Sequence, residues 1–160
     1  MNSPTESFRL RELSRVGGMA PLSVSNYLKE FQKEGLIKKY IKRNVPFYIA
    51  ERNNKKFILY KKIGILYEIN ESGLVDYLWE NLSPDAIILY GSYVKGESTD
   101  ESDIDLFIIG NEEKIDLKKF EKIFGKGIHL IFQKDPKKIP DELKNNIING
   151  ILLKGYFKAI

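Results

Sequence analysis

The chain has 160 residues, 42% of them hydrophobic and 30% charged, which is normal for a soluble protein of one ordinary domain or two small ones. No apolar run approaches the ~18 residues that a membrane span needs, and the first residues do not resemble a signal peptide, so we expect a cytoplasmic protein. The absence of cysteine excludes disulfides, thiolate zinc sites and cysteine nucleophiles. A single histidine, His129, argues against a histidine metal cluster or a conventional catalytic triad.

The net charge of +4 is unevenly distributed along the chain. Residues 1–70 hold 14 Lys and Arg against 6 Asp and Glu, whereas residues 71–160 hold 12 against 16. This asymmetry predicts two parts with different partners, and the basic part suits a polyanion such as DNA. A solvated, lysine-rich surface is the alternative interpretation.

The N-terminal part shows two helical patterns followed by two short strands. Apolar spacing predicts a helix over residues 8–16, which a Gly-Gly pair ends, and a second helix over residues 22–35. Residues 36–42 and 47–51 have the pattern of two strands, with residues 43–46 as the connecting turn. Helix, short turn, helix and β-hairpin is the element order of a winged helix-turn-helix.

In such a unit the second helix, which we expect Ser23 to cap, would enter the DNA groove, and the hairpin would lie on the DNA backbone. The stretch YLKEFQKEGLIKK, residues 27–39, resembles archaeal and bacterial winged-helix regulators, and the resemblance implies binding to double-stranded DNA. Protein contacts or dimerisation are the alternative uses of this fold. The residues expected to contact DNA are Ser23, Ser25, Asn26, Lys29, Lys38, Lys39, Lys42 and Arg43.

The remaining residues alternate between helical and strand patterns. Residues 54–69 predict a helix that links the two parts or forms a dimer interface. The further predicted helices cover residues 73–82, 115–124 and 138–148, the predicted strands cover 86–90, 104–109 and 127–133, and residues 151–157 form a final strand or short helix. The all-apolar segment 86–90 is typical of a strand that is buried on both faces.

The segment that carries chemistry begins where the strand of residues 86–90 ends. Gly91-Ser92 follows this strand, and a polar loop then leads to Asp103-Ile104-Asp105 at the start of the next strand. Glycine allows a tight turn and a close approach of the backbone to a phosphate, to which a serine hydroxyl and backbone N–H can also donate. Residues two apart on a strand point to the same face, so the two carboxylates predict an oxygen-ligand site for Mg²⁺, which the triphosphate would complete. The alternative is a simple turn followed by carboxylates that cap an exposed strand.

This segment resembles the minimal nucleotidyltransferases of the DNA polymerase β superfamily, whose signature is G-S, about ten residues, and D-x-D. Gly91, Ser92, Asp103 and Asp105 carry the match. Gly96 and Ser102 also match frequent family positions, and the likeness covers residues 73–160. The resemblance implies a short mixed sheet flanked by helices, binding of ATP or another nucleoside triphosphate at the glycines and serines, and a catalytic metal on the two aspartates. The chain also resembles the antitoxin branch, which transfers AMP from ATP to a tyrosine of a HEPN toxin.

The sequence departs from the family pattern at one position. Active members carry a third carboxylate on a later strand, and the matching position here holds His129. A neutral histidine could bind a metal or act as a base. It could equally mark a domain that binds nucleotide without turnover, or be an ordinary core residue of an apolar strand.

We therefore expect an α+β or α/β protein in which a winged helix-turn-helix, residues 1–53, is followed by a linker helix, residues 54–70, and a nucleotidyltransferase domain, residues 71–160. The expected function is Mg²⁺-dependent nucleotidyl transfer, with AMP as the group transferred to a protein or small acceptor, alongside DNA binding. The alternative is a DNA-binding regulator whose degenerate transferase domain senses nucleotide. A HEPN toxin and a second copy of the chain are the candidate protein partners.

Overall fold

The computed structural model describes residues 4–156 and consists of two compact units, residues 1–60 and 61–160. The division falls between Tyr60 and Lys61, inside helix α3 (Lys55–Ser72), so that one helix contributes residues to both units. Over the described residues, no helix has the length and apolar character needed to cross a bilayer.

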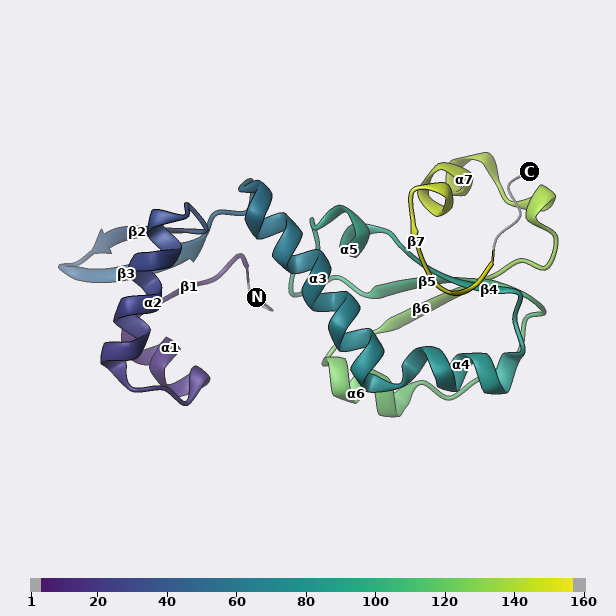
Figure 1. Ribbon diagram of the computed structural model, residues 1–160, viewed down its shortest axis with the longest axis horizontal. Coiled ribbons are helices and arrows are strands. Elements are labelled where there is room, and N and C mark those ends of the chain that lie inside the picture. The colour runs from purple at the N-terminus through teal and green to yellow at the C-terminus, as the bar shows by residue number, and fades with distance from the viewer. Residues whose placement is uncertain (1–3, 157–160) are drawn as a thin grey trace. The chain divides into compact units, whose positions relative to one another are not determined.

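The first unit contains two helices and a small antiparallel sheet. Its elements are β1 (Ser7–Phe8), α1 (Leu10–Gly17), α2 (Pro21–Lys33), β2 (Ile37–Lys42), β3 (Val45–Ala50) and the first turns of α3 (Figure 1). The strands lie in the order β1-β3-β2. The core side chains of this unit are Val24, Leu28, Leu36 and Phe57, which come from both sides of the hairpin in the sequence. The predicted order of helix, helix and hairpin is therefore present.

Several boundaries of the first unit differ from the sequence prediction. Phe8, which we assigned to the first helix, lies in β1 opposite Tyr48. Helix α2 begins at Pro21, whose ring fixes the φ angle that a first helical position needs. Ala20 is consequently the N-cap, and Ser23 lies within the helix rather than capping it. Gly35 follows the end of α2 with a φ of 70°, as expected for the residue after a helix C-cap.

The hairpin turn is shorter than the four residues that the sequence predicted. Val45 and Pro46 already belong to β3 and pair with Lys42 and Ile41 of β2. Only Arg43 and Asn44 form the turn, with φ angles of 51° and 60°. A two-residue turn with both φ angles positive matches the right-handed twist of the flanking strands. This is why the turn has two residues instead of the predicted four.

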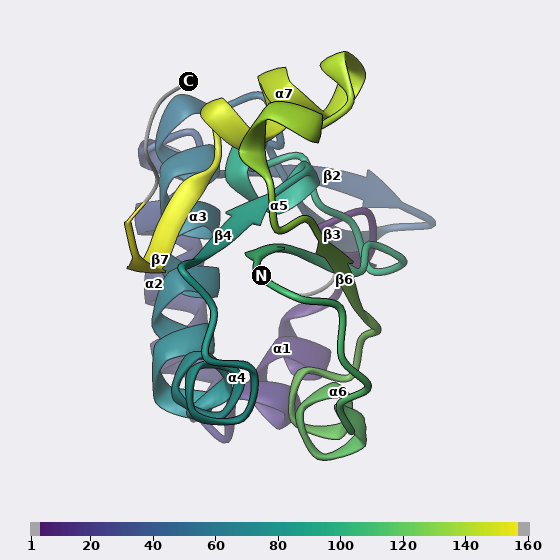
Figure 2. The ribbon, with the colours of Figure 1, turned by 90° about the vertical axis from the view of Figure 1, so that its right-hand side faces the viewer.

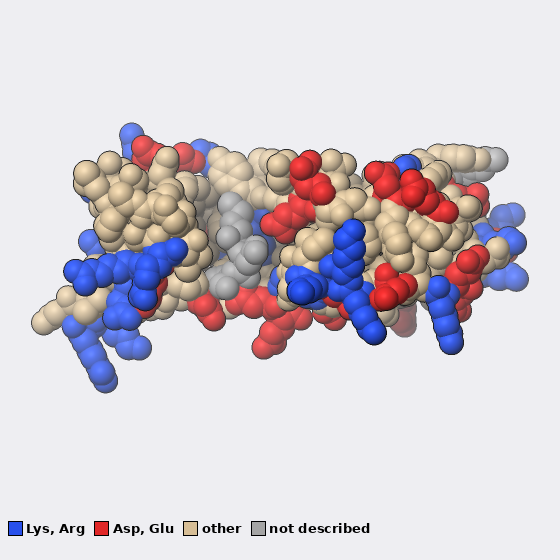
Figure 3. Space-filling model, turned by 90° about the horizontal axis from the view of Figure 1, so that it is seen from below, with Lys and Arg blue, Asp and Glu red and all other residues tan. Residues whose placement is uncertain are grey.

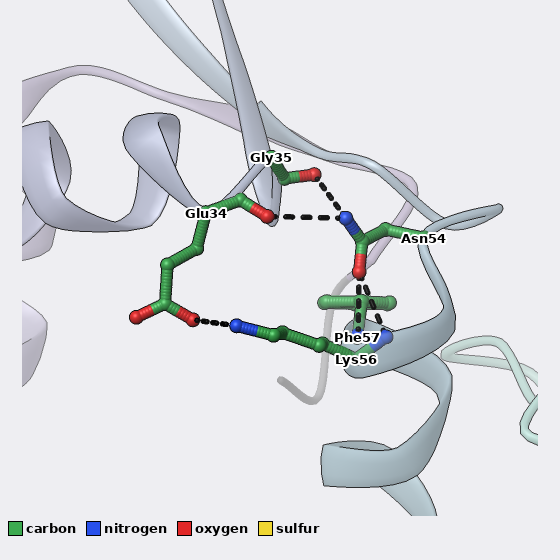
Figure 4. A network of polar contacts seen from close by, with 5 residues as sticks. All are labelled: Glu34, Gly35, Asn54, Lys56 and Phe57. Carbon is green, nitrogen blue, oxygen red and sulfur yellow. Dashed lines mark hydrogen bonds and ion pairs between the residues drawn. The ribbon is translucent and has the colours of Figure 1, made fainter.

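A junction at the start of α3 holds the elements of the first unit together (Figure 4). The side-chain amide of Asn54 donates to the backbone carbonyls of Glu34, at 3.2 Å, and Gly35, at 2.9 Å. Its side-chain oxygen accepts from the backbone N–H groups of Lys56, at 2.8 Å, and Phe57, at 3.2 Å. One side chain therefore satisfies the exposed carbonyls after α2 and the exposed N–H groups at the start of α3.

The second unit is a four-stranded mixed sheet with helices on both faces. After α3 its helices are α4 (Leu74–Leu82), α5 (Ser92–Lys95), α6 (Lys118–Phe124) and α7 (Asp141–Ile148), with a 3₁₀ turn at Pro136–Lys138. Its strands are β4 (Ala86–Tyr90), β5 (Ile104–Ile109), β6 (Ile128–Phe132) and β7 (Ile151–Gly155). The strand order is β6-β5-β4-β7. Only the β5–β6 pair in this sheet is parallel.

Two apolar layers enclose this sheet. Ile87, Leu89, Ile104, Leu106 and Ile108 face one layer, which α3, α4 and α6 cover. The alternate residues of the same strands, among them Ile88, Tyr90, Phe107 and Ile109, face α7 and the segment before it. Figure 2 shows α7 on one side of the strands and α4 and α6 on the other. Every residue of β4 is buried, as its continuous apolar run predicted.

Further differences lie at the ends of helices and in the final element. Helix α6 begins at Lys118 instead of residue 115, and α7 begins at Asp141 instead of residue 138. Pro140 directly precedes α7, and a proline there favours extended backbone in the residue before it. The final element, which we left open between strand and helix, is the strand β7, paired with β4.

Candidate active site

The candidate site lies at the edge of the sheet where β4 ends and β5 and β6 begin. The register places Tyr90 opposite Asp105, and Asp105 beside His129 of the parallel strand β6. These three residues form one row across the sheet. Because side chains alternate along a strand, the row lies on the same face as Phe107, Ile109 and Ile131, which pack in the layer that α7 covers.

Gly91 and Asp105 are in direct proximity. Gly91 has a φ of 78° and a ψ of −150°, a conformation that L-residues with a side chain rarely adopt. A Cβ atom built on Gly91 would overlap with Oδ2 of Asp105 and lie 3.2 Å from its carboxyl carbon. The glycine therefore serves two needs: it allows the turn from β4 into α5, and it leaves room for the carboxylate.

Asp103 is placed against a second glycine. A Cβ atom on Gly127, the residue before β6, would lie 2.6 Å from Oδ1 of Asp103. The carbonyl of Gly127 also accepts a hydrogen bond of 2.9 Å from the backbone N–H of Ile104. Asp103 is exposed, Asp105 is half-buried, and Ile104 between them is fully buried in the opposite layer. Ile104 therefore points into the core, as the spacing of the D-x-D motif predicted.

The other residues of the predicted nucleotide site lie around the loop between α5 and β5. Ser92 is the first residue of α5 and is half-buried, and Gly96 ends this helix with a φ of 76°. Ser102 accepts a hydrogen bond of 2.8 Å from the backbone N–H of Thr99, so its hydroxyl has a partner within the loop. The hydroxyl of Tyr93 donates to the carbonyl of Ser102 at 3.2 Å.

Two lysines hold this loop from outside. The ammonium group of Lys126 donates to the carbonyls of Thr99, at 3.0 Å, and Asp100, at 2.8 Å. The ammonium group of Lys61 donates to the carbonyl of Ser98, which precedes Thr99 and has a buried side chain. Three consecutive carbonyls of the loop are therefore paired with ammonium groups, and the loop ends directly before Asp103. Sequence reasoning did not identify either lysine, because nothing in the spacing connects them to this loop.

The electrostatic environment of the row affects its ionisable groups. Burial raises the pKa of Asp105 above its usual value, and the charge of Asp103 adds to this, while His129 acts in the opposite direction. Burial together with the charge of Asp105 raises the pKa of Tyr90 to about 12. The Tyr90 hydroxyl therefore stays protonated at neutral pH, and the ionised form of Asp105 is less favourable than that of an ordinary surface aspartate.

His129 is exposed, which corrects one of the expectations for it. Its ring is 61% exposed, so the interpretation as an ordinary core residue is wrong. The reason is alternation: Ile128 and Leu130 pack in the layer of α6, and His129 between them points to the other face. Its Nδ1 atom lies 3.6 Å from Oδ1 of Asp105. An exposed imidazole therefore lies beside the carboxylate of Asp105.

The carboxylates of Asp103 and Asp105 are suited to a metal ion that takes its other ligands from water or phosphate. Among the described residues, no group of three His, Asp or Glu side chains could hold a metal ion alone. Mg²⁺ requires only one or two protein carboxylates when phosphate oxygens and water complete its shell. Asp103, directly before β5, and Asp105, the second residue of β5, provide hard oxygen donors, and the two glycines leave space at both carboxylates. Two carboxylates are therefore the number that such an ion takes from a protein.

The first unit presents most of its predicted DNA-contacting residues to solvent. Ser23, Asn26 and Lys29 are exposed on α2, whereas Ser25 is half-buried. Lys39, Lys42 and Arg43 are exposed on the hairpin. Figure 3 shows Lys and Arg side chains gathered over the region of the β2–β3 hairpin, at the left of the view. Lys38 differs from the other lysines of the hairpin because it forms an ion pair with Glu51, the residue after β3.

The fold and the site geometry agree with one family. A family model described as Polymerase beta, Nucleotidyltransferase matches residues 73–155, which is just over half of the chain. The chain therefore belongs to the polymerase beta nucleotidyltransferase family, whose general function is nucleotidyl transfer and whose substrate is a nucleotide. The matched range contains β4 to β7 and every residue of the row. No curated protein and no solved structure matches the chain significantly.

Proposed function

We propose that this protein transfers a nucleotidyl group, AMP from ATP, to a hydroxyl of a protein or small acceptor in a Mg²⁺-dependent reaction. The observation that carries the proposal is the proximity of Asp105 to Gly91. The carboxylate of the D-x-D motif lies against the glycine of the G-S motif, although 13 residues lie between them in the chain. A phosphate held at Gly91 would then lie beside a metal held at Asp105.

Each residue has a defined role in this reaction. Asp103 and Asp105 would hold the metal, which offsets the charge of the phosphates, and Gly91 and Ser92 would bind the triphosphate. The acceptor hydroxyl oxygen bonds to the α-phosphorus, the bond from this phosphorus to the bridging oxygen breaks, and pyrophosphate leaves. His129 is exposed beside Asp105 and is the side chain of the row that can accept the hydroxyl proton. Gly96 and Ser102 support the loop that leads to Asp103.

For the first unit we propose a winged helix-turn-helix that binds double-stranded DNA. The order of α1, α2 and a tight hairpin supports this, as do the exposed basic side chains on α2 and the hairpin. Lys39, Lys42 and Arg43 would contact the phosphate backbone, and Ser23, Asn26 and Lys29 would lie on the helix that enters the groove. Failure to bind any duplex at low salt would remove this part of the proposal.

One observation favours a second candidate function. The row contains an imidazole where we expect active relatives to carry a third carboxylate, and in this second candidate the domain binds nucleotide without turning it over. The protein would then be a DNA-binding regulator whose second unit senses nucleotide. An antitoxin that acts on a HEPN toxin is compatible with either candidate, because such a protein can also bind the DNA of its own operon.

The first test is thermal unfolding with and without Mg²⁺ and each nucleoside triphosphate. We expect ATP with Mg²⁺ to raise the unfolding temperature, because a ligand at ~100 times its Kd adds about 2.7 kcal/mol to stability. The double variant Asp103→Asn/Asp105→Asn should lose this increase. The matched control is Glu101→Gln, which removes an exposed carboxylate from the same loop and should keep it.

The second step follows transfer of label from α-labelled ATP to candidate acceptors. Transfer that requires both aspartates supports the enzyme. A magnesium-dependent increase in unfolding temperature without transfer to any acceptor supports the nucleotide-sensing regulator instead. The absence of any nucleotide effect on unfolding would contradict both.

A further inference from the structure

The turn between α6 and β6 contacts the loop that leads to Asp103 at two places. The ammonium group of Lys126 donates to the carbonyls of Thr99 and Asp100, at 3.0 Å and 2.8 Å. Gly127, the next residue along the turn, lies against the carboxyl group of Asp103 itself. One short turn therefore contacts both the backbone of this loop and the carboxylate at its end.

The backbone of this turn is held beside the sheet. The N–H of Lys126 donates to the carbonyl of Glu121 in α6, at 3.2 Å. The carbonyl of Gly127 accepts from the N–H of Ile104, at 2.9 Å, and Ile104 pairs with Ile128 where the two parallel strands begin. The side chain of Lys126 therefore starts from an element that is bonded to both α6 and β5. Because its partners are backbone carbonyls, its two hydrogen bonds restrict the path of the loop relative to the sheet.

The missing side chain at residue 127 serves the carboxylate and not the turn. Gly127 does not have a positive φ, so alanine can adopt the same backbone conformation. A Cβ atom there would nevertheless lie 2.6 Å from Oδ1 and 3.0 Å from the carboxyl carbon of Asp103, and the three nearest atoms all belong to this carboxyl group. Gly91 differs, because its φ of 78° by itself disfavours any other residue. A methyl group at residue 127 would therefore displace the carboxylate of Asp103 without straining the backbone.

We propose that Lys126 and Gly127 are positioning residues for the carboxylate of Asp103. Lys126 fixes the loop before Asp103, so a ligand does not have to order this loop when it binds, and Gly127 leaves the volume that the carboxyl group occupies. The effect of both residues on Mg²⁺ and nucleotide rests on the proposed function, whereas their effect on the ligand-free loop does not.

The charge of Lys126 allows its positioning role to be distinguished from a purely electrostatic one. An ammonium group beside this loop repels a cation bound at the end of the loop, so loss of the charge alone would strengthen Mg²⁺ binding. Loss of a residue that orients a metal ligand has the opposite effect and weakens metal binding by about 10- to 100-fold. The variant Lys126→Met removes the ammonium group and keeps a long side chain, and the two roles predict opposite changes for it.

Thermal unfolding of the full chain at a fixed ATP concentration and increasing Mg²⁺ measures this change. For Lys126→Met we expect the Mg²⁺ concentration at half of the maximal increase in unfolding temperature to rise by about tenfold or more. Lys126→Arg keeps the charge and the N–H donors and should return this concentration close to the native value. The control is Lys122→Met, at an exposed lysine of α6, which should leave it unchanged. A concentration that is unchanged or lower in Lys126→Met would overturn the role of Lys126.

The same titration tests Gly127. Gly127→Ala should raise the half-maximal Mg²⁺ concentration by about tenfold, because the added methyl group displaces the carboxylate of Asp103. The matched control is Gly110→Ala at the other end of β5, where φ is likewise not positive and the nearest atoms lie 3.5 Å from an added Cβ. Circular dichroism spectra confirm that each variant is folded. Equal effects of the two glycine variants would overturn the role of Gly127.

Nuclear magnetic resonance of the ligand-free chain tests the positioning without the proposed function. The N–H of Ser102 donates to the carbonyl of Thr99 within the loop, at 3.2 Å, and its hydrogen exchange should become about tenfold faster in Lys126→Met. In Gly127→Ala the carboxyl-carbon resonance of Asp103 should shift. If both changes occur in a chain that nucleotide does not stabilise, the proposed function fails and the positioning stands. If neither change occurs, the positioning is overturned, whatever the native chain binds.

Discussion

Asp105 combines two conflicting requirements. In the proposed function it would have to be ionised to hold a metal, yet burial raises its pKa, and the neighbouring charge of Asp103 raises it further. His129 offsets part of this effect without removing it. A carboxylate kept ionised under these conditions costs the ligand-free protein stability, and a bound cation would recover that cost. The same residue is therefore expected to favour ligand binding and to oppose folding of the ligand-free chain.

Replacement of Asp105 by Asn should consequently stabilise the ligand-free protein at neutral pH. A folded-state pKa above the unfolded value of 3.8 means that the native carboxyl binds its proton more readily than the unfolded one. The native sequence thus loses stability as the pH rises from 3.8 through the folded-state pKa. The gain from Asp105→Asn should be complete above that pKa and absent below pH 3.8.

Thermal unfolding of Asp105→Asn and the native protein between pH 3.5 and pH 7.5 measures this difference, with about 0.5 pH units between points. Asp85→Asn, which changes an exposed aspartate outside the row, is the control and should show no such pH-dependent gain. A variant that is less stable than the native protein at pH 7 would show that the ionised carboxylate has favourable contacts in the ligand-free fold.

The residues of the site differ in how far the sequence can reveal them. Gly91, Ser92, Asp103 and Asp105 are visible from spacing, because the motif joins two apolar strands. Tyr90 and Lys126 are not, because their positions depend on the β4–β5 register and on a side chain that reaches back across the loop. Gly127 becomes informative only when the carboxylate of Asp103 is seen against it.

Among the elements, the junction at Asn54 is the most clearly defined. Its side chain makes four hydrogen bonds that connect the end of α2 with the start of α3 (Figure 4). Lys56 adds an ion pair of 3.2 Å with Glu34 across the same junction. Phe57, the next residue along α3, is buried in the first unit. By capping α3, the side chain of Asn54 therefore also positions Phe57, which packs in the core of the first unit.

We expect Asn54→Ala to destabilise the first unit by about 1–2 kcal/mol, the usual effect of removing a helix N-cap. Asn54→Asp keeps an oxygen that accepts from the α3 N–H groups but cannot donate to the carbonyls of Glu34 and Gly35, so it should recover only part of the loss. Urea unfolding followed by circular dichroism measures both variants. Asn53→Ala, at an exposed position next to it, is the control, and an equal loss there would contradict the capping role.

Periodicity predicts some elements better than others. The strands of residues 86–90 and 104–109 were predicted with their exact bounds, because the first is a continuous apolar run and Asp105 is the only polar residue in the second. Strand β1 was not predicted, because two residues are too few to show an alternation of apolar and polar side chains. These residues form a strand only through their pairing with β3. The hairpin turn was predicted too long because proline is typical of turns, and the prediction therefore included Pro46. In the structure Pro46 lies in a strand.

At the scale of the whole molecule, the two units differ greatly in their cores. The core side chains Val24, Leu28, Leu36 and Phe57 lie in the first unit, and the other core side chains of the described residues lie in the second unit. Because stability grows with the apolar area that a unit removes from water, we expect the first unit to be the less stable. The single tryptophan of the chain, Trp79, packs against the core of the second unit.

Unfolding in urea should therefore give two transitions. Circular dichroism, which reports both units, should begin to change at a lower urea concentration than the fluorescence of Trp79, which reports the second unit. Each transition should have its own slope with denaturant, in proportion to the surface it exposes. Coincident curves from the two measurements would show that the chain unfolds as one cooperative body and would contradict the prediction.

The position of His129 has a consequence for how this protein's chemistry can change over generations. Asp105 lies on β5, between two other strands, whereas His129 lies on β6, an edge strand, and most of its ring is in solvent. A mutation at residue 129 alters the donors beside Asp105 and leaves the buried layers unchanged. A carboxylate beside Asp105 is thus one amino-acid substitution away, at little cost to folding. Selection can adjust the activity of such a domain while its scaffold is inherited intact.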